Sequence, residues 1–508
     1  MTARADGLTS GEQRLRAALE TVRARVTQLI PDGDVDRDQV AVNELAWAVA
    51  RSEAALATAK WAEDTGDALA QDIGAAAIAE AIGSIAGRSA LEVIEEARLL
   101  AQIAANYRPL ENLGLSEEQG LLRQTFRDFG RREIKPRAAE IHRENSDIPE
   151  TILRGLGELG TFGLSIPESY GGSQGEAEGF DTMLIVTEEL SRASLAAGGS
   201  LVTRPEILVR ALVRGGTEEQ KARWLPAIAT GEKLVAVATT EPDYGSDVAS
   251  LKCRAERVGD GWVVNGTKLW CTFGGRAEVL MLLLRTADAG HRGLSVFVAE
   301  KPAFRGHQFV FRQPDGGVLE GRGIPTIGYR GMHTFELSFE NFRLPADALV
   351  GGEEWMNRGF YLQMESFAMG RLQTAGRAVG VMQAALEDAL EYASNRIVFG
   401  NRIADFGLPK AMLGRMIVQV ASARRLSYRA ANLLAAGGGQ MEASLAKLYA
   451  SRMAEQVTRD AVQLHGGMGY GEETDVSRYF VDARVLSIFE GAEEVLALKV
   501  IGKALIGT

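Results

Sequence analysis

Cysteine and histidine are scarce in this sequence, which has two cysteines and five histidines among 508 residues. Cys253 and Cys271 are too few to build a disulfide framework or a cysteine metal cluster. The histidines are scattered and lack the paired helical spacing that zinc hydrolases use for their ligands. The sequence therefore predicts no metal site.

Basic clusters and long apolar runs are also missing. The net charge is −11 and no block of like charges stands out, which disfavours nucleic acid as a partner. No apolar run approaches the length of about 20 residues that a membrane span needs. The start MTARADGLTSGEQ lacks the basic segment and apolar core of a secretory signal. We expect a cytoplasmic protein that binds neither nucleic acid nor membrane.

The composition is nevertheless sufficient for several globular cores. The hydrophobic fraction is 46%, and 508 residues exceed the length of about 250–300 at which one core stops growing. Periodicity divides the chain into four parts, and an α+β fold is predicted. These parts are a helical N-terminal extension (1–112), an N-terminal α domain (113–235), a middle β domain (236–348) and a C-terminal four-helix bundle (349–508).

The extension is rich in Ala, Glu and Arg, with apolar residues at helical intervals, as in ELAWAVARSEAALATAKWAED. Breaks at 32–34 and 83–87 predict two or three helices. No functional motif is visible there, so a structural or oligomerisation role is expected.

Two capping boxes mark helix starts in the predicted α domain, at Ser116 with Gln119 and at Thr217 with Gln220. The first of these helices is predicted to end near Pro136, because proline disrupts a helix interior.

The period changes in the middle of the chain. VLMLLL at 279–284 is an apolar run of strand length, and Phe335, Leu337 and Phe339 alternate with polar residues. A small β-barrel or sandwich is predicted here.

Further on, a stripe at three- and four-residue steps predicts a long helix with one buried face. The stripe consists of Val379, Met382, Leu386, Leu390, Ala393 and Ile397.

Two polar turns, at 240–247 and 270–275, flank an alternating segment that is predicted to turn at Asn265-Gly266, a favoured hairpin pair. Such a hairpin would bring the two turns together at one end of a sheet. Their polar and aromatic side chains suit a planar, phosphorylated ligand, but hydroxyls in turns and a buried tryptophan are also ordinary structural features. The side chains concerned are Thr240, Glu241, Ser246, Trp270 and Thr272.

TTEPDYGSD and KLWCTFGG in these turns resemble the paired flavin-binding signatures of the acyl-CoA dehydrogenase family, and LSIPESYGG and EEQKARWLP also recur there. The resemblance covers about residues 113–508 and implies the family's helical, β, helical order and bound FAD. It implies that Thr240 and Thr272 hydrogen-bond the isoalloxazine ring and that Ser246 contacts the pyrophosphate. Trp270 is implied to pack against the flavin.

Tyr244 departs from the small residue common in the first motif. This departure suggests a modified wall beside the substrate channel.

RIVFG at 396–400 and QLHGGMGY at 463–470 resemble segments through which one subunit reaches the flavin of its neighbour. A homodimer or homotetramer is therefore implied. Gly407 departs from a glutamine often found after the FG pair, which puts the adenine contact in question. The residues implied to contact FAD are Arg396, Phe399, Gln463, Gly466 and Gly467.

Glu490 in SIFEGAEEV is the candidate catalytic base. Gly491 permits a tight turn, and the apolar SIF indicates partial burial, although a glutamate at such a turn is ordinarily solvent-exposed. The motif resembles the family's Glu-Gly turn, which bears the base and adjoins the substrate. Ala492 replaces a threonine common in that motif.

Some branched-chain members carry the base immediately before an arginine that corresponds to Arg371. Gly370 occupies that position here and cannot act as a base, which favours Glu490. Arg371 matches the family arginine at the CoA end of the channel, although a surface salt bridge is an alternative role.

The resemblance implies FAD-dependent α,β-dehydrogenation of an acyl-CoA thioester, with electron-transferring flavoprotein as acceptor. The extension, GSLVTRPEIL and GYRGMHTFEL most resemble the methylsuccinyl-CoA dehydrogenase subfamily, which forms mesaconyl-CoA in the ethylmalonyl-CoA pathway. A free carboxylate on the acyl chain needs a cationic partner, and Arg204 is the candidate, with a solvent-facing arginine as the alternative.

Three other functions remain open. The first is a short or branched monocarboxylic acyl-CoA dehydrogenase of fatty-acid or amino-acid breakdown, and the second is an acyl-CoA oxidase. The third is a DNA-binding protein of this fold with little activity, which the acidic charge disfavours.

Overall fold

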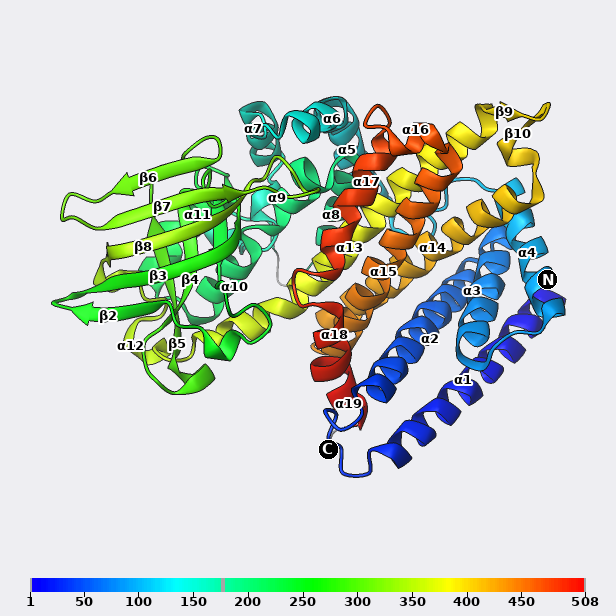
Figure 1. The fold of residues 1–508 in the computed structure, drawn as a ribbon, viewed down its shortest axis with the longest axis horizontal. Helices are drawn as coiled ribbons and strands as arrows, with labels where there is room; N and C mark the ends of the chain where they lie inside the picture. The colour runs from blue at the N-terminus through cyan, green and yellow to red at the C-terminus, as the bar shows by residue number, and fades with distance from the viewer. Residues whose placement is uncertain (1, 175–178, 507–508) are drawn as a thin grey trace. The chain divides into compact units, whose positions relative to one another are not determined.

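The computed structural model describes residues 2–174 and 179–506 and divides into two compact units (Figure 1). The first unit combines Met1–Gly130, Phe180–Leu195 and Arg371–Thr508. The second combines Arg131–Gly179 and Ala196–Gly370.

The extension folds into four helices, where the sequence pattern predicted two or three (Figure 1). Gly66 is in the left-handed conformation (φ 63°) and ends the second helix, and the next begins at once with Asp67 as its N-cap. This two-residue connection is too short to interrupt the apolar pattern, so it was not predicted. The four helices are α1 (Thr2–Leu29), α2 (Gln39–Thr65), α3 (Ala68–Ala86) and α4 (Ala90–Ala105).

Helix α3 corrects the expectation that no apolar segment approaches the length of a membrane span. It is long and apolar enough by length and composition alone, but half of it is buried against other helices, including α1 and α2. A core helix meets the same criterion, so this is weak evidence for a membrane span.

Both predicted capping boxes are present, at the starts of α5 (Glu117–Phe129) and α11 (Glu218–Ala229). The predicted end near Pro136 is wrong. The chain stays helical through a π-helical segment at Gly130–Ile134, and Pro136 lies in the first turn of α6 (Lys135–Glu144). Proline is tolerated in a first turn because its missing N–H would have no intrahelical partner there.

Within the first unit, α15 contacts α14 and α17, and α14 also contacts α2 and α4 of the extension. Four residues of the predicted stripe are buried, namely Val379, Met382, Leu386 and Ala393, and Leu390 is half-buried. Ile397 lies beyond the helix in strand β9 and is 63% exposed. The helices of this region are α13 (Gly359–Asn395), α14 (Gly407–Ala435), α15 (Gln440–His465), α16 (Gly467–Tyr470), α17 (Asp475–Ala483), α18 (Glu493–Val495) and α19 (Lys503–Ile506). A short hairpin pairs β9 (Ile397–Val398) with β10 (Asn401–Arg402).

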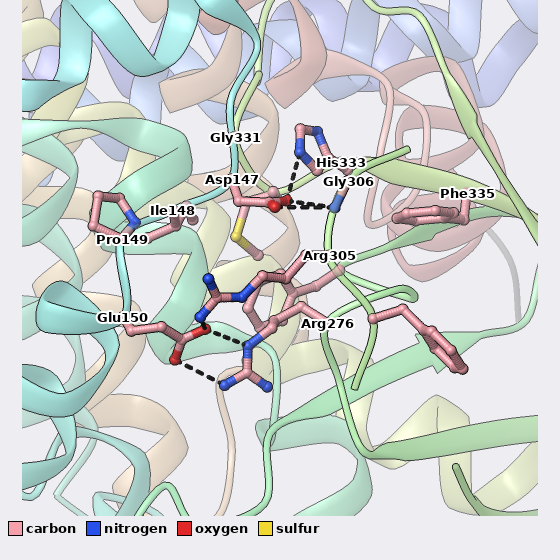
Figure 2. Close-up of a pocket in the computed structure, with 13 residues that line it drawn as sticks. Asp147, Ile148, Pro149, Glu150, Arg276, Arg305, Gly306, Gly331, His333 and Phe335 are labelled. Carbon is pink, nitrogen blue, oxygen red and sulfur yellow. Dashed lines mark hydrogen bonds and ion pairs between the residues drawn. The ribbon is translucent and has the colours of Figure 1, made fainter. Parts of the chain in front are cut away.

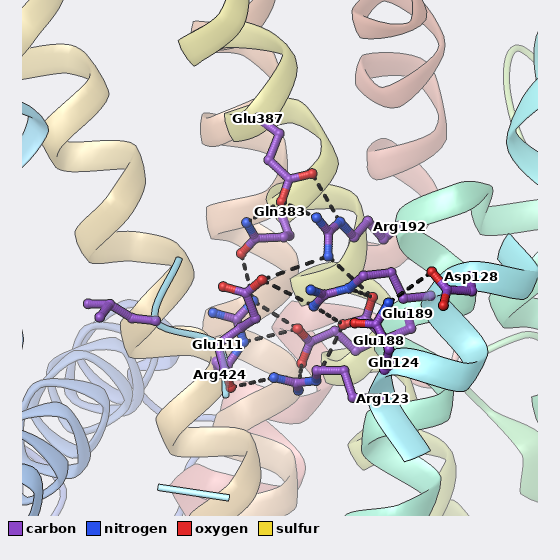
Figure 3. Close-up of polar contacts among 12 residues, drawn as sticks. Glu111, Arg123, Gln124, Asp128, Glu188, Glu189, Arg192, Gln383, Glu387 and Arg424 are labelled. Atoms are coloured by element: carbon purple, nitrogen blue, oxygen red, sulfur yellow. Dashed lines mark hydrogen bonds and ion pairs between the residues drawn. The ribbon is translucent and has the colours of Figure 1, made fainter. Parts of the chain in front are cut away.

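A buried cluster of charged residues connects several segments of the first unit (Figure 3). Glu188 on α8 (Phe180–Ala193) accepts hydrogen bonds from Arg123 on α5 at 3.2 Å and from Arg424 on α14 at 2.8 and 3.0 Å. Burial alone would raise the pKa of Glu188, but these two guanidinium groups lower it to about 2. Glu111, which follows α4, pairs with Arg127 at 3.1 Å and so ties the extension to the same cluster.

In the second unit, short helices pack on one curled sheet. Apolar residues of α10 and α11 form a continuous core with β1, β4 and β5. The helices of this unit outside α13 are α6, α7 (Glu150–Glu158), α9 (Ser200–Thr203), α10 (Glu206–Gly215), α11 and α12 (Gly352–Trp355).

The strands run in the spatial order β1-β4-β2-β3-β8-β7-β6, and β5 pairs with β4. The predicted middle β structure is confirmed, and β4 is buried along its whole length as its apolar run indicates. The strands are β1 (Val235–Ala238), β2 (Arg254–Val258), β3 (Gly261–Thr272), β4 (Val279–Arg285), β5 (Leu294–Glu300), β6 (Gln308–Arg312), β7 (Val318–Ile324) and β8 (Thr334–Leu344).

The predicted turn at Asn265-Gly266 is wrong. The hairpin between β2 and β3 turns at 259–260, and Asn265-Gly266 lies inside β3, where the pairing with β8 shifts register. The Asn265 side chain accepts a hydrogen bond from the Asn341 N–H at 2.8 Å. A Cβ at Gly266 would meet Cys253 at 2.9 Å, so this glycine serves a close approach within the sheet.

Candidate active site

The two predicted flavin-binding turns lie side by side in the second unit. The Leu269 N–H donates to the Thr240 carbonyl at 2.7 Å, and the buried Lys268 ammonium donates to the Thr239 carbonyl at 2.9 Å. The turns therefore meet although the hairpin between them turns at a different position from the one predicted.

The Glu241 side chain was predicted to suit a ligand, but it is buried and pairs with other groups of the protein. It is 5% exposed and pairs with Lys268 at 2.8 Å. It also accepts the N–H groups of Lys252 and Cys253 at 2.7 and 2.8 Å. This buried, fully hydrogen-bonded carboxylate fixes the first turn onto β3.

At the end of β3, Trp270 is 53% exposed and has positive φ (61°). Thr272 is buried, and its hydroxyl lies 3.2 Å from the Thr334 hydroxyl on β8. Phe273 also has positive φ (68°) and is buried. Two non-glycine residues in this sparsely populated conformation mark a backbone that its surroundings hold in place.

The remaining residues of the first turn are more open. Thr240 is half-buried and Ser246 is exposed. Tyr244 is half-buried, exchanges two backbone hydrogen bonds with Glu241, and has the Lys252 ammonium 5.1 Å from its ring centre. Tyr244 lines a surface hollow together with Lys252 and Arg254.

Arg204 lies between α9 and α10 and lines a narrow cavity with Leu201 and Phe273. Its Nε donates to the Ser200 carbonyl at 3.3 Å. Because Phe273 follows Thr272 directly, this cavity adjoins the second predicted flavin-binding turn.

A polar pocket beside the same turn was not predicted from the sequence (Figure 2). Asp147 accepts the Gly306 N–H at 2.9 Å and lies 2.9 Å from His333. Glu150 pairs with both nitrogens of the Arg276 fork at 2.9 Å. The charged groups of this pocket come from segments more than 120 residues apart, so no local motif in the sequence indicated the pocket.

The predicted base lies in the first unit, on a turn of unusual backbone conformation. Glu490 and Gly491 have φ of 55° and 94°. The N–H groups of Ile488 and Phe489 both donate to the Val485 carbonyl, at 2.9 and 3.1 Å. Glu490 and Phe489 are half-buried and Ile488 is 55% exposed, in agreement with the partial burial expected of this segment.

Three cationic side chains surround this turn. Arg371 on α13 donates to the Ser444 hydroxyl at 3.3 Å; burial lowers its pKa, while the nearby Glu490 charge acts in the opposite sense. Arg377, also on α13, lies 4.5 Å over the Phe489 ring. Lys447 on α15 donates to the Gly491 carbonyl at 2.6 Å. Only Arg371 was singled out from the sequence; the available signal for Lys447 was a lysine within the apolar helical segment SLAKLYA.

The segments predicted to reach a neighbouring subunit also lie in the first unit. Tyr392 at the end of α13 stacks on His465 at the end of α15, with ring centres 4.2 Å apart. This contact brings the two helix ends together. Gly466 has positive φ (60°), consistent with a turn that requires glycine.

The predicted FAD contacts on these segments are open to solvent. Phe399 is 96% exposed and has positive φ (49°). Arg396, Gln463, Gly466 and Gly467 are also exposed.

Within residues 2–174 and 179–506, no group of three or more His, Cys, Asp or Glu residues is arranged to hold a metal ion. Burial raises the pKa of Cys253 to about 11 and that of Cys271 to about 12.

Three domain models of one family match consecutive parts of the chain. The acyl-CoA dehydrogenase N-terminal domain matches residues 116–232, the middle domain 236–342 and the C-terminal domain 357–506. Residues before 116 lie outside these matches. The matches confirm the predicted order of a helical, a β and a second helical domain, while the three boundaries between the four predicted domains stay predictions.

Individual relatives agree with these matches. The chain is 42% identical over 390 residues to (2S)-methylsuccinyl-CoA dehydrogenase of Cereibacter sphaeroides, covering 76% of this chain and 69% of that protein. It is 33% identical to the caffeyl-CoA reductase-Etf complex subunit CarC of Acetobacterium woodii, covering 77% and 99%. The structure of butyryl-CoA dehydrogenase from Megasphaera elsdenii matches with a TM-score of 0.71 at 30% identity, covering 77% and 99%. The predicted resemblance is confirmed: the chain belongs to the acyl-CoA dehydrogenase family.

Proposed function

We propose that this protein oxidises (2S)-methylsuccinyl-CoA to mesaconyl-CoA with bound FAD. The observation that carries the proposal is the 42% identity to a (2S)-methylsuccinyl-CoA dehydrogenase, on a chain that keeps the glutamate-glycine turn at Glu490 and both flavin-binding turns.

Removal of the α-proton is the demanding step, because the α-carbon of a saturated thioester is only weakly acidic. Glu490 would take this proton, and its own backbone N–H would donate to the thioester oxygen as negative charge develops there. The backbone of Glu490 is in the left-handed conformation, with φ 55°. When bound, FAD supplies the acceptor for the hydride equivalent that leaves the β-carbon.

The second unit offers groups that fit FAD. Trp270 presents a 53% exposed ring at the end of a strand whose neighbouring residues are largely buried, which suits packing against a planar ligand. Thr240 and Thr272 supply hydroxyl groups on the two adjoining turns, and Ser246 supplies an exposed hydroxyl for the pyrophosphate. In the first unit, Arg396 would contribute positive charge for the phosphates of a flavin held by a second copy.

For the acyl group, a free carboxylate distinguishes methylsuccinyl-CoA from monocarboxylic thioesters. We assign Arg204 as its partner, because a guanidinium fork binds a carboxylate through two parallel hydrogen bonds. The narrow cavity that Arg204 lines with Leu201 suits a short chain. Tyr244 would form part of the channel wall, and Arg371 would act toward its CoA end.

Assembly and electron transfer complete the proposal. Phe399 and Tyr470 are 96% and 89% exposed, and a second copy of the chain would cover such apolar groups in a homodimer or homotetramer. Electron-transferring flavoprotein is proposed as the acceptor, since one relative is named as a subunit of an Etf complex. A cytoplasmic location is proposed as well.

Anaerobic bleaching of the flavin-loaded protein tests the substrate. The panel is methylsuccinyl-, butyryl-, isobutyryl-, isovaleryl-, glutaryl- and octanoyl-CoA. Fast bleaching by methylsuccinyl-CoA alone is expected, and Arg204→Met should raise its KM about 10-fold or more, as loss of a charged hydrogen bond does. Arg214→Met, an exposed arginine on α10, is the matched control. Faster bleaching by butyryl- or isovaleryl-CoA would replace the proposed substrate with a monocarboxylic one.

A further inference from the structure

One face of α15 contacts the segment that carries Glu490 at successive helical turns. Lys447 donates to the Gly491 carbonyl at 2.6 Å, and Ser451 donates to the Leu486 carbonyl at 3.1 Å. Glu455 accepts a hydrogen bond from the Ser487 hydroxyl. Steps of four residues place these three side chains on one helix face, so a single rigid helix fixes the segment at three points.

The contact of Lys447 falls where the backbone needs support. Glu490 and Gly491 both have positive φ, at 55° and 94°. For a residue with a side chain, such as Glu490, this conformation is strained and persists only where surrounding contacts hold it. Gly491 adopts positive φ without this strain, but its carbonyl directly follows Glu490, so the bond from Lys447 fixes the turn next to the strained residue.

Lys447 is a charged residue in a buried position. Lys447 is 0% exposed, and burial lowers its pKa to about 8. The charged groups around it are Glu490 and Glu493 from the turn and α18, and Arg371 and Arg377 from α13. Burying a cation is costly unless it is hydrogen-bonded, and the Lys447 ammonium donates its hydrogen bond to the turn of the candidate base.

We infer that Lys447 is a positioning residue for Glu490: its buried ammonium holds the Gly491 carbonyl and thereby keeps the glutamate in the conformation that takes the substrate proton. The inference rests on the proposed function of Glu490. Lys447 acts through the turn and is not assigned a contact with substrate or flavin.

If Lys447 positions Glu490 in this way, the rate of flavin reduction depends on the charge of Lys447. As the pH rises through about 8, the ammonium loses its proton and its hydrogen bond to the Gly491 carbonyl weakens. The rate of flavin reduction in the native protein should therefore fall as the pH rises through this range. This fall in rate should be absent in Lys447→Arg, because a guanidinium stays charged throughout the range.

The test is single-turnover flavin reduction by methylsuccinyl-CoA between pH 6 and 9 with the flavin-loaded protein. Lys447→Met should reduce the rate about 10- to 100-fold, the usual effect of slight misplacement of a catalytic group. The substrate concentration at half-maximal rate should stay the same. Arg459→Met, an exposed charge on the same helix, is the matched control and should behave as the native protein.

A native rate and pH profile in Lys447→Met would overturn the assignment of Lys447, as would a fall in rate near pH 8 that persists in Lys447→Arg. If Lys447→Met does not fold, the Lys447→Arg profile decides the question alone. If no thioester reduces the native protein's flavin, the proposed function fails and the inference fails with it, whereas a native rate in the variant would overturn the inference only.

Discussion

The buried charged cluster of the first unit gives a quantitative prediction for Glu188→Gln. Glu188 is 2% exposed and accepts from two guanidinium groups that are themselves almost fully buried, those of Arg123 and Arg424. Glutamine keeps the shape but removes the charge, so two buried cations lose their shared anion. Loss of one partner of a buried ion pair costs about 3–5 kcal/mol, and we expect about 3 kcal/mol here because Glu189 and Glu111 remain in the cluster.

Hydrogen exchange of the amides of α8 and α14, followed by mass spectrometry, resolves this unit from the rest of the chain. A loss of about 3 kcal/mol would accelerate exchange about 100-fold where exchange follows unfolding of this unit. Glu387→Gln is the matched control: this residue pairs with Arg192 at the edge of the cluster, its side chain is 34% exposed, and its loss should cost less than about 1 kcal/mol.

The effect of Glu188→Gln should also depend on pH. The pKa of Glu188 is lowered in the folded state, to about 2 from 4.5, by Arg123 and Arg424. Its stabilising contribution is therefore fully present above pH 4.5 and is lost as the pH falls towards 2. The native protein and the variant should differ at pH 7 and converge in acid. Equal exchange at pH 7, or an effect no larger than that of Glu387→Gln, would refute the reasoning.

Two further predictions concern the second unit. Glu241→Gln should weaken flavin retention and destabilise this unit by about 3 kcal/mol, because Lys268 is left buried without its anion; flavin absorbance and thermal unfolding check this, and unchanged values of both would contradict it. Cys253 and Cys271 should resist iodoacetamide at pH 8 in the folded protein and react in denaturant, because burial raises their pKa values to about 11 and 12; labelling of the folded protein would contradict that burial.

The sequence predicted local structure well where a short motif or an apolar run decides which element forms. The capping box of Ser116 and Gln119 starts α5, and the apolar run at 279–284 lies in the buried strand β4. Asn265-Gly266 was misread because pairing of β3 with β8 outweighs the turn preference of that dipeptide. Ile397 fits the helical period but follows the end of α13, and periodicity defines helix ends poorly.

The candidate site likewise has a part that the sequence indicated and a part that it did not. The two predicted flavin-binding turns and the Glu490 turn carry motifs, so the sequence could indicate them as candidates. Lys447 carries no motif, and its contact with Gly491 joins residues 44 apart. The Glu241 pairing with Lys268 is likewise a consequence of strand packing, since an alternating pattern leaves the burial of a single charged residue undetermined.

The most direct test of the account is the rate of anaerobic flavin reduction by methylsuccinyl-CoA in Glu490→Gln, with Glu494→Gln as the matched control on an exposed residue of the following helix. The account predicts that the Glu490→Gln protein stays yellow and binds the thioester, while its flavin is reduced about 10²- to 10⁴-fold more slowly, as expected when a general base is removed. The control should keep the native rate. A native rate of reduction in Glu490→Gln would contradict the assignment of the base.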